Sequence, residues 1–105
     1  MSGKIEQLES LYRETPEDPF VVYALAKEYE QTGQSDKSVA LYQKLLAEHP
    51  DYVGTYYHFG KLLEELGQQD RALPIYKKGL AIAKKVGDDL AYRELTSALM
   101  DLENQ

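Results

Sequence analysis

YALAKEYEQTGQSDKSVALYQKLLA (residues 23–47) is followed, 34 residues further along the chain, by YHFGKLLEELGQQDRALPIYKKGLA (residues 57–81). The two stretches align without a gap and share ten identical positions. The identical pairs are Tyr23/Tyr57, Lys27/Lys61, Glu30/Glu64, Gly33/Gly67, Gln34/Gln68, Asp36/Asp70, Tyr42/Tyr76, Lys44/Lys78, Leu46/Leu80 and Ala47/Ala81. A fixed period of this length indicates a repeat architecture, in which each repeat is one supersecondary unit.

Each repeat is predicted to consist of two helices on either side of a glycine turn. The first helix of the first repeat has apolar residues at the spacing of one helical face, namely Val22, Leu25, Ala26 and Tyr29. Asp18 is predicted to cap this helix, Pro19 is tolerated in its first turn, and Gly33 ends it in the left-handed conformation. The second helix is predicted to have an Asp36 cap, to end at Pro50 and to carry the stripe Val39, Tyr42 and Leu46.

The second repeat has the same arrangement. Its first helix is predicted to have an Asp51 cap, to end at Gly67 and to carry the stripe Tyr56, Phe59, Gly60 and Leu63. Its second helix is predicted to have an Asp70 cap and the stripe Leu73, Tyr76, Leu80 and Ala83. Pro74 lies close enough to the start of this helix to be tolerated. Because no stretch alternates apolar and polar residues as a strand does, we expect an all-helical protein.

Two further helices are predicted at the ends of the chain. Residues 3–14 have a helical stripe of Ile5, Leu8 and Leu11, as expected for the second helix of a truncated repeat. Residues 88–103 are predicted to form a capping helix that begins at Asp88 and packs Leu95, Ala98, Leu99 and Leu102. The predicted single domain, residues 1–105, therefore consists of the helix 3–14, repeat 1 (19–50), repeat 2 (53–86) and the helix 88–103.

The pattern resembles the tetratricopeptide repeat, a 34-residue helix–turn–helix unit with the signature W-x2-L-G-x2-Y, then A-x3-F, then P. In the first repeat these places hold Val22, Leu25, Ala26, Tyr29, Ser38, Tyr42 and Pro50. In the second repeat they hold Tyr56, Phe59, Gly60, Leu63, Ala72, Tyr76 and Lys84. Small residues at positions 26 and 60 allow two helices to approach each other. The missing proline at Lys84 predicts that the last helix of repeat 2 continues to Val86.

This resemblance covers about residues 4–103. It implies an all-α fold, a right-handed α-solenoid of antiparallel helix pairs with about five helices. It also implies a small stand-alone module with two full repeats and flanking helices. In this family the first helix of each pair lines a concave groove that binds an extended peptide or a helix. The resemblance therefore implies a non-enzymatic scaffold whose partner is a protein or peptide.

Candidate partner-binding residues are the identical ones that lie outside the core stripes. Tyr23, Lys27 and Glu30 share one helical face because they are four and three residues apart. This face recurs in the second repeat, and His58 beside Tyr57 and Tyr92 at the C-terminal end of the groove complete the set. The candidates are Tyr23, Lys27, Glu30, Tyr57, His58, Lys61, Glu64 and Tyr92. Two simpler explanations of this repeated face stay open. The lysine and glutamate three residues apart can form pairs that only stabilise the helix, or the repeat can be a recent duplication without selection for binding.

Composition narrows the functional classes further. The chain has 18 acidic and 12 basic residues and a net charge of -6, which disfavours nucleic acid as a partner. Lys77, Lys78, Lys84 and Lys85 gather on one segment, where a solvated helix face is the simplest interpretation. The absence of cysteine excludes disulfides, thiolate catalysis and cysteine-based zinc sites. There is no apolar run that would span a membrane and no signal-like N-terminus, so a cytoplasmic location is expected.

The sequence shows no catalytic or cofactor motif. It contains no nucleophile elbow, phosphate-binding glycine loop or HExxH. With no cysteine and no carboxylate pair at metal spacing, neither His49 nor His58 is expected to be a ligand, so no enzyme, cofactor or metal site is predicted. An alternative function is a self-associating structural module. The end helices would have apolar edges that could pair between chains to give a homo-oligomer.

Overall fold

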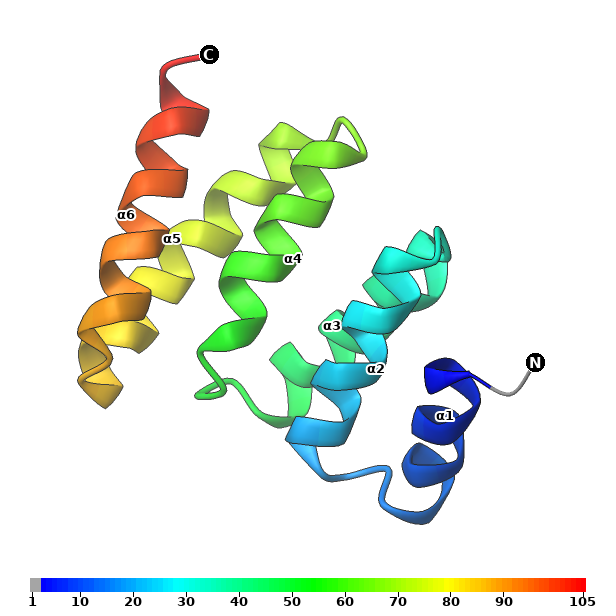
Figure 1. Cartoon of the computed structure of the whole chain (residues 1–105). Helices are drawn as coiled ribbons and strands as arrows, with labels where there is room; N and C mark the ends of the chain where they lie inside the picture. Colours follow the sequence, from blue (N-terminus) through cyan, green and yellow to red (C-terminus); the bar gives the residue numbers. More distant parts are fainter. Residues whose placement is uncertain (1–2) are drawn as a thin grey trace. The chain divides into compact units, whose positions relative to one another are not determined.

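The computed structural model describes residues 3–105, and in this range the chain forms six α-helices and no β-strand (Figure 1). The helices are α1 (Lys4–Glu14), α2 (Pro19–Gln31), α3 (Ser35–Glu48), α4 (Gly54–Glu65), α5 (Gln69–Val86) and α6 (Asp89–Glu103). The all-helical class is confirmed. The described residues form six helices where about five were predicted, and these six are the helices assigned from the sequence, one at each end and two in each repeat.

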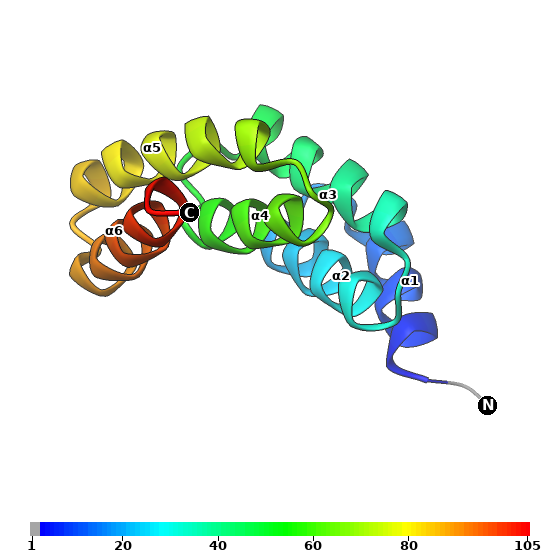
Figure 2. The same cartoon turned by 90° about the horizontal axis from the view of Figure 1, so that it is seen from above.

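The chain divides into two compact units that meet in sequence between Tyr52 and Val53. In the first unit, α2 packs against both α1 and α3. In the second unit, α4, α5 and α6 all pack against one another (Figure 2). Each unit therefore has a central antiparallel helix pair, α2 with α3 or α4 with α5, and one additional helix that covers part of the pair.

The two helix pairs turn at glycines, as the sequence predicts. Gly33 and Gly67 have φ angles of +78° and +76°, a left-handed conformation that costs glycine little because it has no Cβ atom. The Gln34 N–H donates to the Tyr29 carbonyl and the Gln68 N–H donates to the Leu63 carbonyl, each at 2.8 Å. These bonds satisfy carbonyl groups that the end of a helix would otherwise leave unpaired.

Two of the predicted helix caps are confirmed. Asp18 Oδ1 accepts a hydrogen bond of 2.9 Å from the Phe20 N–H at the start of α2. Asp88 Oδ1 accepts an equal bond from the Ala91 N–H at the start of α6. In both helices the carboxylate also faces the positive end of the helix dipole.

The caps predicted at Asp36, Asp51 and Asp70 were wrong. α3 and α5 begin two residues earlier than an aspartate cap requires, after Gln34 and Gln68, so both aspartates lie in the first helical turn. The glycine turns are so short that the residue after each glycine already occupies the cap position. Asp51 lies in the turn before α4, and this helix begins at Gly54.

The core of the first unit follows the whole predicted stripe of α2, but it follows that of α3 only at Tyr42. Val22, Leu25, Ala26 and Tyr29 are buried. On α3, Val39 and Leu46 are only half-buried, whereas Ser38, Leu41, Tyr42 and Leu45 are buried. The hydroxyl of Ser38 donates a 2.8 Å hydrogen bond to the Ala26 carbonyl, so a polar residue occupies the core where α2 and α3 approach closely.

The second unit is packed around two tyrosine–glycine contacts. A Cβ atom at Gly60 of α4 would lie 2.2 Å from Cε1 of Tyr76, and a Cβ atom at Gly79 of α5 would lie 2.5 Å from Cβ of Tyr56. Both tyrosines have no exposed surface. The close approach of two helices that the sequence predicts at position 60 is therefore confirmed. The predicted α5 stripe is confirmed at Tyr76 and Ala83, which are buried. Leu73 and Leu80 are only half-buried, and Ala72 and Gly79 are buried instead.

α5 continues to Val86 and ends at Gly87, as the missing proline at Lys84 predicts. The φ angle of Gly87 is +77°, and the Asp88 N–H donates to the Ala83 carbonyl at 2.9 Å, so this turn repeats the geometry of the other two. The turn brings α6 back beside α5 and α4.

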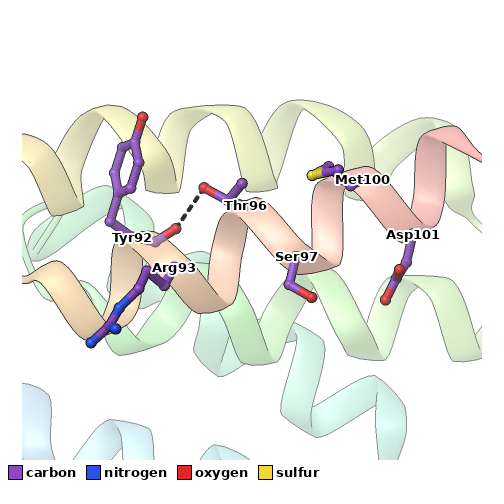
Figure 3. Close-up of a pocket in the computed structure, with 6 residues that line it drawn as sticks. All are labelled: Tyr92, Arg93, Thr96, Ser97, Met100 and Asp101. Carbon is purple, nitrogen blue, oxygen red and sulfur yellow. Dashed lines mark hydrogen bonds between the residues drawn. The ribbon is translucent and has the colours of Figure 1, made fainter.

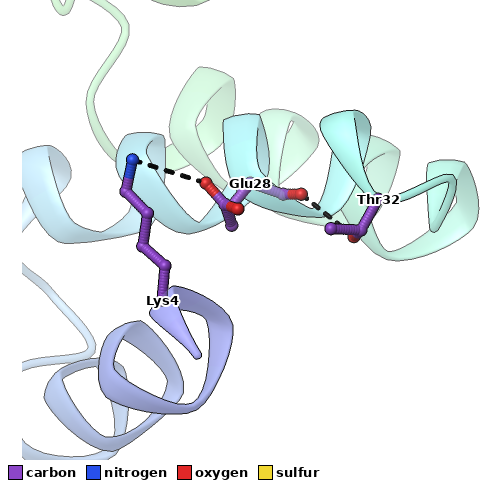
Figure 4. Close-up of polar contacts among 3 residues, drawn as sticks. All are labelled: Lys4, Glu28 and Thr32. Atoms are coloured by element: carbon purple, nitrogen blue, oxygen red, sulfur yellow. Dashed lines mark hydrogen bonds and ion pairs between the residues drawn. The ribbon is translucent and has the colours of Figure 1, made fainter. Parts of the chain in front are cut away.

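α1 packs against α2, and polar contacts also join the two helices. α1 has no buried residue. Lys4 Nζ of α1 lies 3.6 Å from Glu28 Oε1 of α2 (Figure 4). At the C-terminal end of α2, Thr32 Oγ1 donates a 3.0 Å hydrogen bond to the Glu28 carbonyl. The Tyr29 hydroxyl donates to Glu9, and burial followed by this bond raises the pKa of Tyr29 to about 12. Because exposed ion pairs stabilise little, the Tyr29–Glu9 bond is the more important attachment.

Candidate partner-binding surfaces

In the first unit, the candidate face on α2 is formed by Tyr23 and Lys27. Both side chains are half-buried, so each keeps part of its surface exposed to solvent. Lys27 Nζ lies 5.9 Å from the centre of the Tyr23 ring, which is within the range of a cation–π interaction. This contact leaves a cation and an aromatic ring on the surface together. Such a pair suits a partner that offers both apolar and polar groups.

Tyr52 adjoins this face, although the sequence analysis did not include it. Its ring centre lies 5.4 Å from that of Tyr23, and the two rings are inclined by 55°. Burial, and then the charge of Asp18, raises the pKa of Tyr52. Tyr52 also lines a hollow of about 320 Å³ with Pro19, His49, Pro50 and Asp51. Position 52 has no tyrosine counterpart 34 residues later, so the repeat gives no signal for it.

Glu30, the third predicted member of this face, is hydrogen-bonded to the second helix of its own repeat. The Tyr42 hydroxyl donates to Glu30 Oε1 at 2.9 Å. Tyr42 is fully buried, and its pKa is raised well above the usual range by burial and then by the charge of Glu30. Glu30 therefore links α2 to α3, and this contact differs from the Lys27–Glu30 pairing that the sequence analysis left open.

In the second unit, the candidate face on α4 contains Tyr57, His58 and Lys61. All three are half-buried. The rings of Tyr57 and His58 are 5.3 Å apart and almost perpendicular, at 88°, so the two side chains support each other edge to face. The structure thus places His58 beside Tyr57, as the sequence predicts.

Glu64 repeats the behaviour of Glu30. It accepts a hydrogen bond from the Tyr76 hydroxyl, and Gln105 Nε2 donates to its other oxygen at 3.3 Å. Burial, followed by the bond to Glu64, raises the pKa of Tyr76 well above the usual range. Two of the ten repeated identities, Glu30/Glu64 and Tyr42/Tyr76, are therefore explained by one hydrogen bond that forms within each repeat. The repeated tyrosine and lysine are not explained in this way.

Tyr92 lies on α6 and is 42% exposed. It lines a hollow of about 380 Å³ with Arg93, Thr96, Ser97, Met100 and Asp101. Tyr92, Thr96 and Met100 form one edge of α6, and Thr96 Oγ1 donates to the Tyr92 carbonyl at 2.8 Å (Figure 3). A second, smaller hollow joins Tyr92 to Ala83, Lys84 and Asp89. The surroundings of Tyr92 therefore come from α5 and α6.

Residues 3–105 contain no group of three or more His, Asp or Glu side chains placed to hold a metal ion. Over the same range, no helix combines the length and the hydropathy that a membrane span needs.

Comparison with known proteins places the chain in a family. Two tetratricopeptide repeat models match it, one over residues 21–52 and the other over residues 41–73. A tetratricopeptide repeat domain protein from Salinibacter ruber is 40% identical in its crystal structure, with a TM-score of 0.80, and the match covers 83% of this chain and 97% of that one. No match to the chain is found among curated proteins.

Two solution structures are also similar. A tetratricopeptide repeat domain protein from Salinibacter ruber is 42% identical with a TM-score of 0.81, covering 85% of this chain and 90% of that one. A protein from Bordetella parapertussis is 26% identical with a TM-score of 0.84, covering 99% of this chain and 90% of that one. The chain belongs to the tetratricopeptide repeat family. Repeats of this family generally mediate protein–protein interactions, and the family is typically non-catalytic.

Proposed function

We propose that the chain is a non-enzymatic scaffold that binds a protein or peptide segment through the faces of α2 and α4, the helices that line the concave groove in the family. The observation that carries this proposal is the Tyr–Lys pair that recurs after 34 residues, Tyr23/Lys27 and Tyr57/Lys61. All four side chains are partly exposed, whereas the repeated Tyr–Glu pairs are used for internal hydrogen bonds. Repeated residues that the core does not need are best accounted for by binding.

The chemistry of these faces indicates the kind of segment that they suit. Tyrosine provides a flat surface with few rotamers to freeze, and lysine provides a donor beside it. Glu30 and Glu64 follow these lysines by three residues in the sequence, and each accepts a hydrogen bond from a tyrosine. We therefore expect a partner segment with apolar or aromatic side chains and hydrogen-bond acceptors, rather than a strongly acidic one.

The test is a double substitution, Tyr23→Ala with Tyr57→Ala. The tagged wild-type protein and the variant are used to capture proteins from a lysate of the source organism. A protein that only the wild type retains is then purified and titrated by calorimetry. If the two faces bind it, the affinity falls by at least about tenfold, because a buried interface tyrosine commonly contributes more than about 1 kcal/mol.

A matched control separates this effect from a general loss of surface apolar area. Phe20 and Leu90 are 66% and 62% exposed and lie outside the proposed faces. Phe20→Ala with Leu90→Ala should leave the affinity within about twofold. Circular dichroism must show that both variants keep their helices. A partner that binds the Tyr23→Ala/Tyr57→Ala variant as tightly as the wild type would exclude these faces as its site.

A second candidate function is self-association through the end helices. It is favoured by the exposed apolar side chains there, since Leu11 of α1 is 46% exposed and Met100 of α6 is 56% exposed. Light scattering at rising protein concentration tests it directly. A mass that increases with concentration in the wild type but not in Leu11→Ser/Met100→Ser supports this function, and the mass of a single chain throughout excludes it.

A further inference from the structure

The outer face of α5 has a charge opposite to that of the whole chain. α5 contains five of the chain's 12 basic residues, Arg71, Lys77, Lys78, Lys84 and Lys85, but only one of its 18 acidic residues, Asp70. The helix therefore has a net charge of +4 in a chain of net charge -6. All five basic residues are exposed. The charge is thus concentrated on one surface, which we call the basic face.

The basic residues are spaced regularly along α5. Arg71, Lys78 and Lys85 are seven residues apart, and so are Lys77 and Lys84. Seven residues make almost two helical turns, so each set lies in a row with steps of about 10.5 Å, and the face extends over about 21 Å. Within the second unit, α4 and α6 both pack against α5 (Figures 1 and 2). The residues that α5 buries, Ala72, Tyr76, Gly79 and Ala83, lie on the side of the helix away from the basic residues.

Internal pairing does not account for Lys77, Lys78 and Lys84 on this face. Within residues 3–105 these three side chains take part in neither of the ion pairs Lys4–Glu28 and Lys44–Glu48, whereas Lys85 does have an internal contact. Arg71 donates to the side-chain oxygen of Gln68 at 2.6 Å, a neutral acceptor. Acidic neighbours lie at both ends of the face, where Asp70 precedes Arg71 in sequence and Asp89 lines the same hollow as Lys84. The charges of Lys77 and Lys78 face solvent.

We propose that the basic face docks an acidic segment of another protein. A face of about 21 Å matches six or seven residues of extended chain at about 3.3 Å per residue. A long polyanion is less suitable, because beyond this face the rest of the chain carries a net charge of -10 and would repel it. α5 also offers no exposed aromatic ring for base stacking, since its one aromatic residue, Tyr76, is fully buried.

An anionic lipid surface is the other alternative, and the structure disfavours it. Membrane docking needs exposed apolar side chains beside the cations. Between the rows of lysines the exposed positions are Pro74 and Ala81, which are small. Val86 and Leu90 are exposed beyond the end of the face, but Asp88 and Asp89 lie between them in sequence. Docking at the basic face is separate from binding at the Tyr–Lys faces, so either can fail without the other.

The experiment is a titration of ¹⁵N-labelled protein with a hexaglutamate peptide at low salt, followed by amide chemical shifts. The shifts are expected to concentrate in residues 69–86 and to disappear at high salt. Lys77→Gln/Lys78→Gln/Lys84→Gln should weaken binding by about tenfold, as three exposed charge pairs together would. The matched control, Lys4→Gln/Lys37→Gln/Arg93→Gln, changes the net charge equally and should stay within about twofold of the wild type.

Further arms distinguish the alternatives. The Tyr23→Ala/Tyr57→Ala variant should bind hexaglutamate as the wild type does, which separates this surface from the proposed function. If the two triple variants, Lys77→Gln/Lys78→Gln/Lys84→Gln and Lys4→Gln/Lys37→Gln/Arg93→Gln, lose affinity for hexaglutamate equally, the proposal is overturned, because net charge alone would then explain the binding. Amide chemical shift changes that fall outside α5, or no such changes at all, would also overturn the proposal. Tighter binding of dodecathymidylate or of phosphatidylserine vesicles than of hexaglutamate would overturn it as well.

Discussion

Replacing Gly60 by alanine tests whether the close approach of α4 and α5 is essential. The added Cβ atom would lie 2.2 Å from Cε1 of Tyr76 and 2.7 Å from both Cδ1 and Cζ. The Tyr76 ring has little room to move, because it is fully buried and its hydroxyl is hydrogen-bonded to Glu64. Either α4 and α5 move apart or the ring moves and this bond is weakened.

The magnitude follows from two opposing effects. Alanine favours the helix over glycine by about 1 kcal/mol. Overpacking costs about 1–3 kcal/mol, and losing a hydrogen bond to a charged group costs about 1.5–3 kcal/mol more if the ring swings away. We therefore expect Gly60→Ala to lower the free energy of unfolding by about 2 kcal/mol. Urea unfolding followed by circular dichroism measures the change.

A second background makes the test sharper. In a Tyr76→Leu protein the ring is absent, so Gly60→Ala should no longer destabilise and should instead stabilise by up to about 1 kcal/mol through helix propensity. A reversal of sign between the two backgrounds would identify the ring contact as the cause. If Gly60→Ala stabilises the protein that retains Tyr76, the close approach does not constrain position 60 and this reasoning is refuted.

Two further predictions concern the helix ends and the buried tyrosines. Asp18→Ala should lower the free energy of unfolding by about 1 kcal/mol because it removes the cap of α2. Asp36→Ala removes no cap and should lower it by at most about 0.3 kcal/mol. Equal effects of the two substitutions in urea unfolding would contradict the assignment of the caps. Tyr29 has a pKa of about 12 in the folded protein against 10.0 in the unfolded chain, so its contribution to stability is complete below about pH 10 and is lost as the pH rises towards 12. Tyr29→Phe should reduce the loss of stability between about pH 10 and pH 12, and an unchanged slope in unfolding experiments at these pH values would count against the Glu9 contact.

Much of the fold could be predicted from local patterns. The 34-residue period, the glycine turns and the apolar stripes of α2 and α4 each depend on residues close together in sequence. Asp18 and Asp88 were recognisable as caps for the same reason, because a cap acts within its own first turn. The candidate face of Tyr23 and Lys27 was also visible, since two residues four apart must lie on the same side of a helix.

The sequence could not show which partner each side chain would find. Glu30 lies three residues after Lys27, which suggested a pair within α2, yet the structure pairs it with Tyr42 of α3. Tyr52 does not follow the repeat at all, and its contact with Tyr23 depends on the path of the chain after α3. Contacts of this kind are set by how two helices are placed against each other, which periodicity within one helix does not define.

The sequence by itself therefore determined the family, the repeat and the residues that it shares, because these depend on spacing along the chain. The tertiary structure decided the role of each shared residue. It used Glu30, Glu64, Tyr42 and Tyr76 for bonds between helices and left Tyr23, Lys27, Tyr57 and Lys61 partly exposed. The physical reason is that a buried polar group must find a hydrogen-bond partner, and only the packing of the helices determines which groups are buried together.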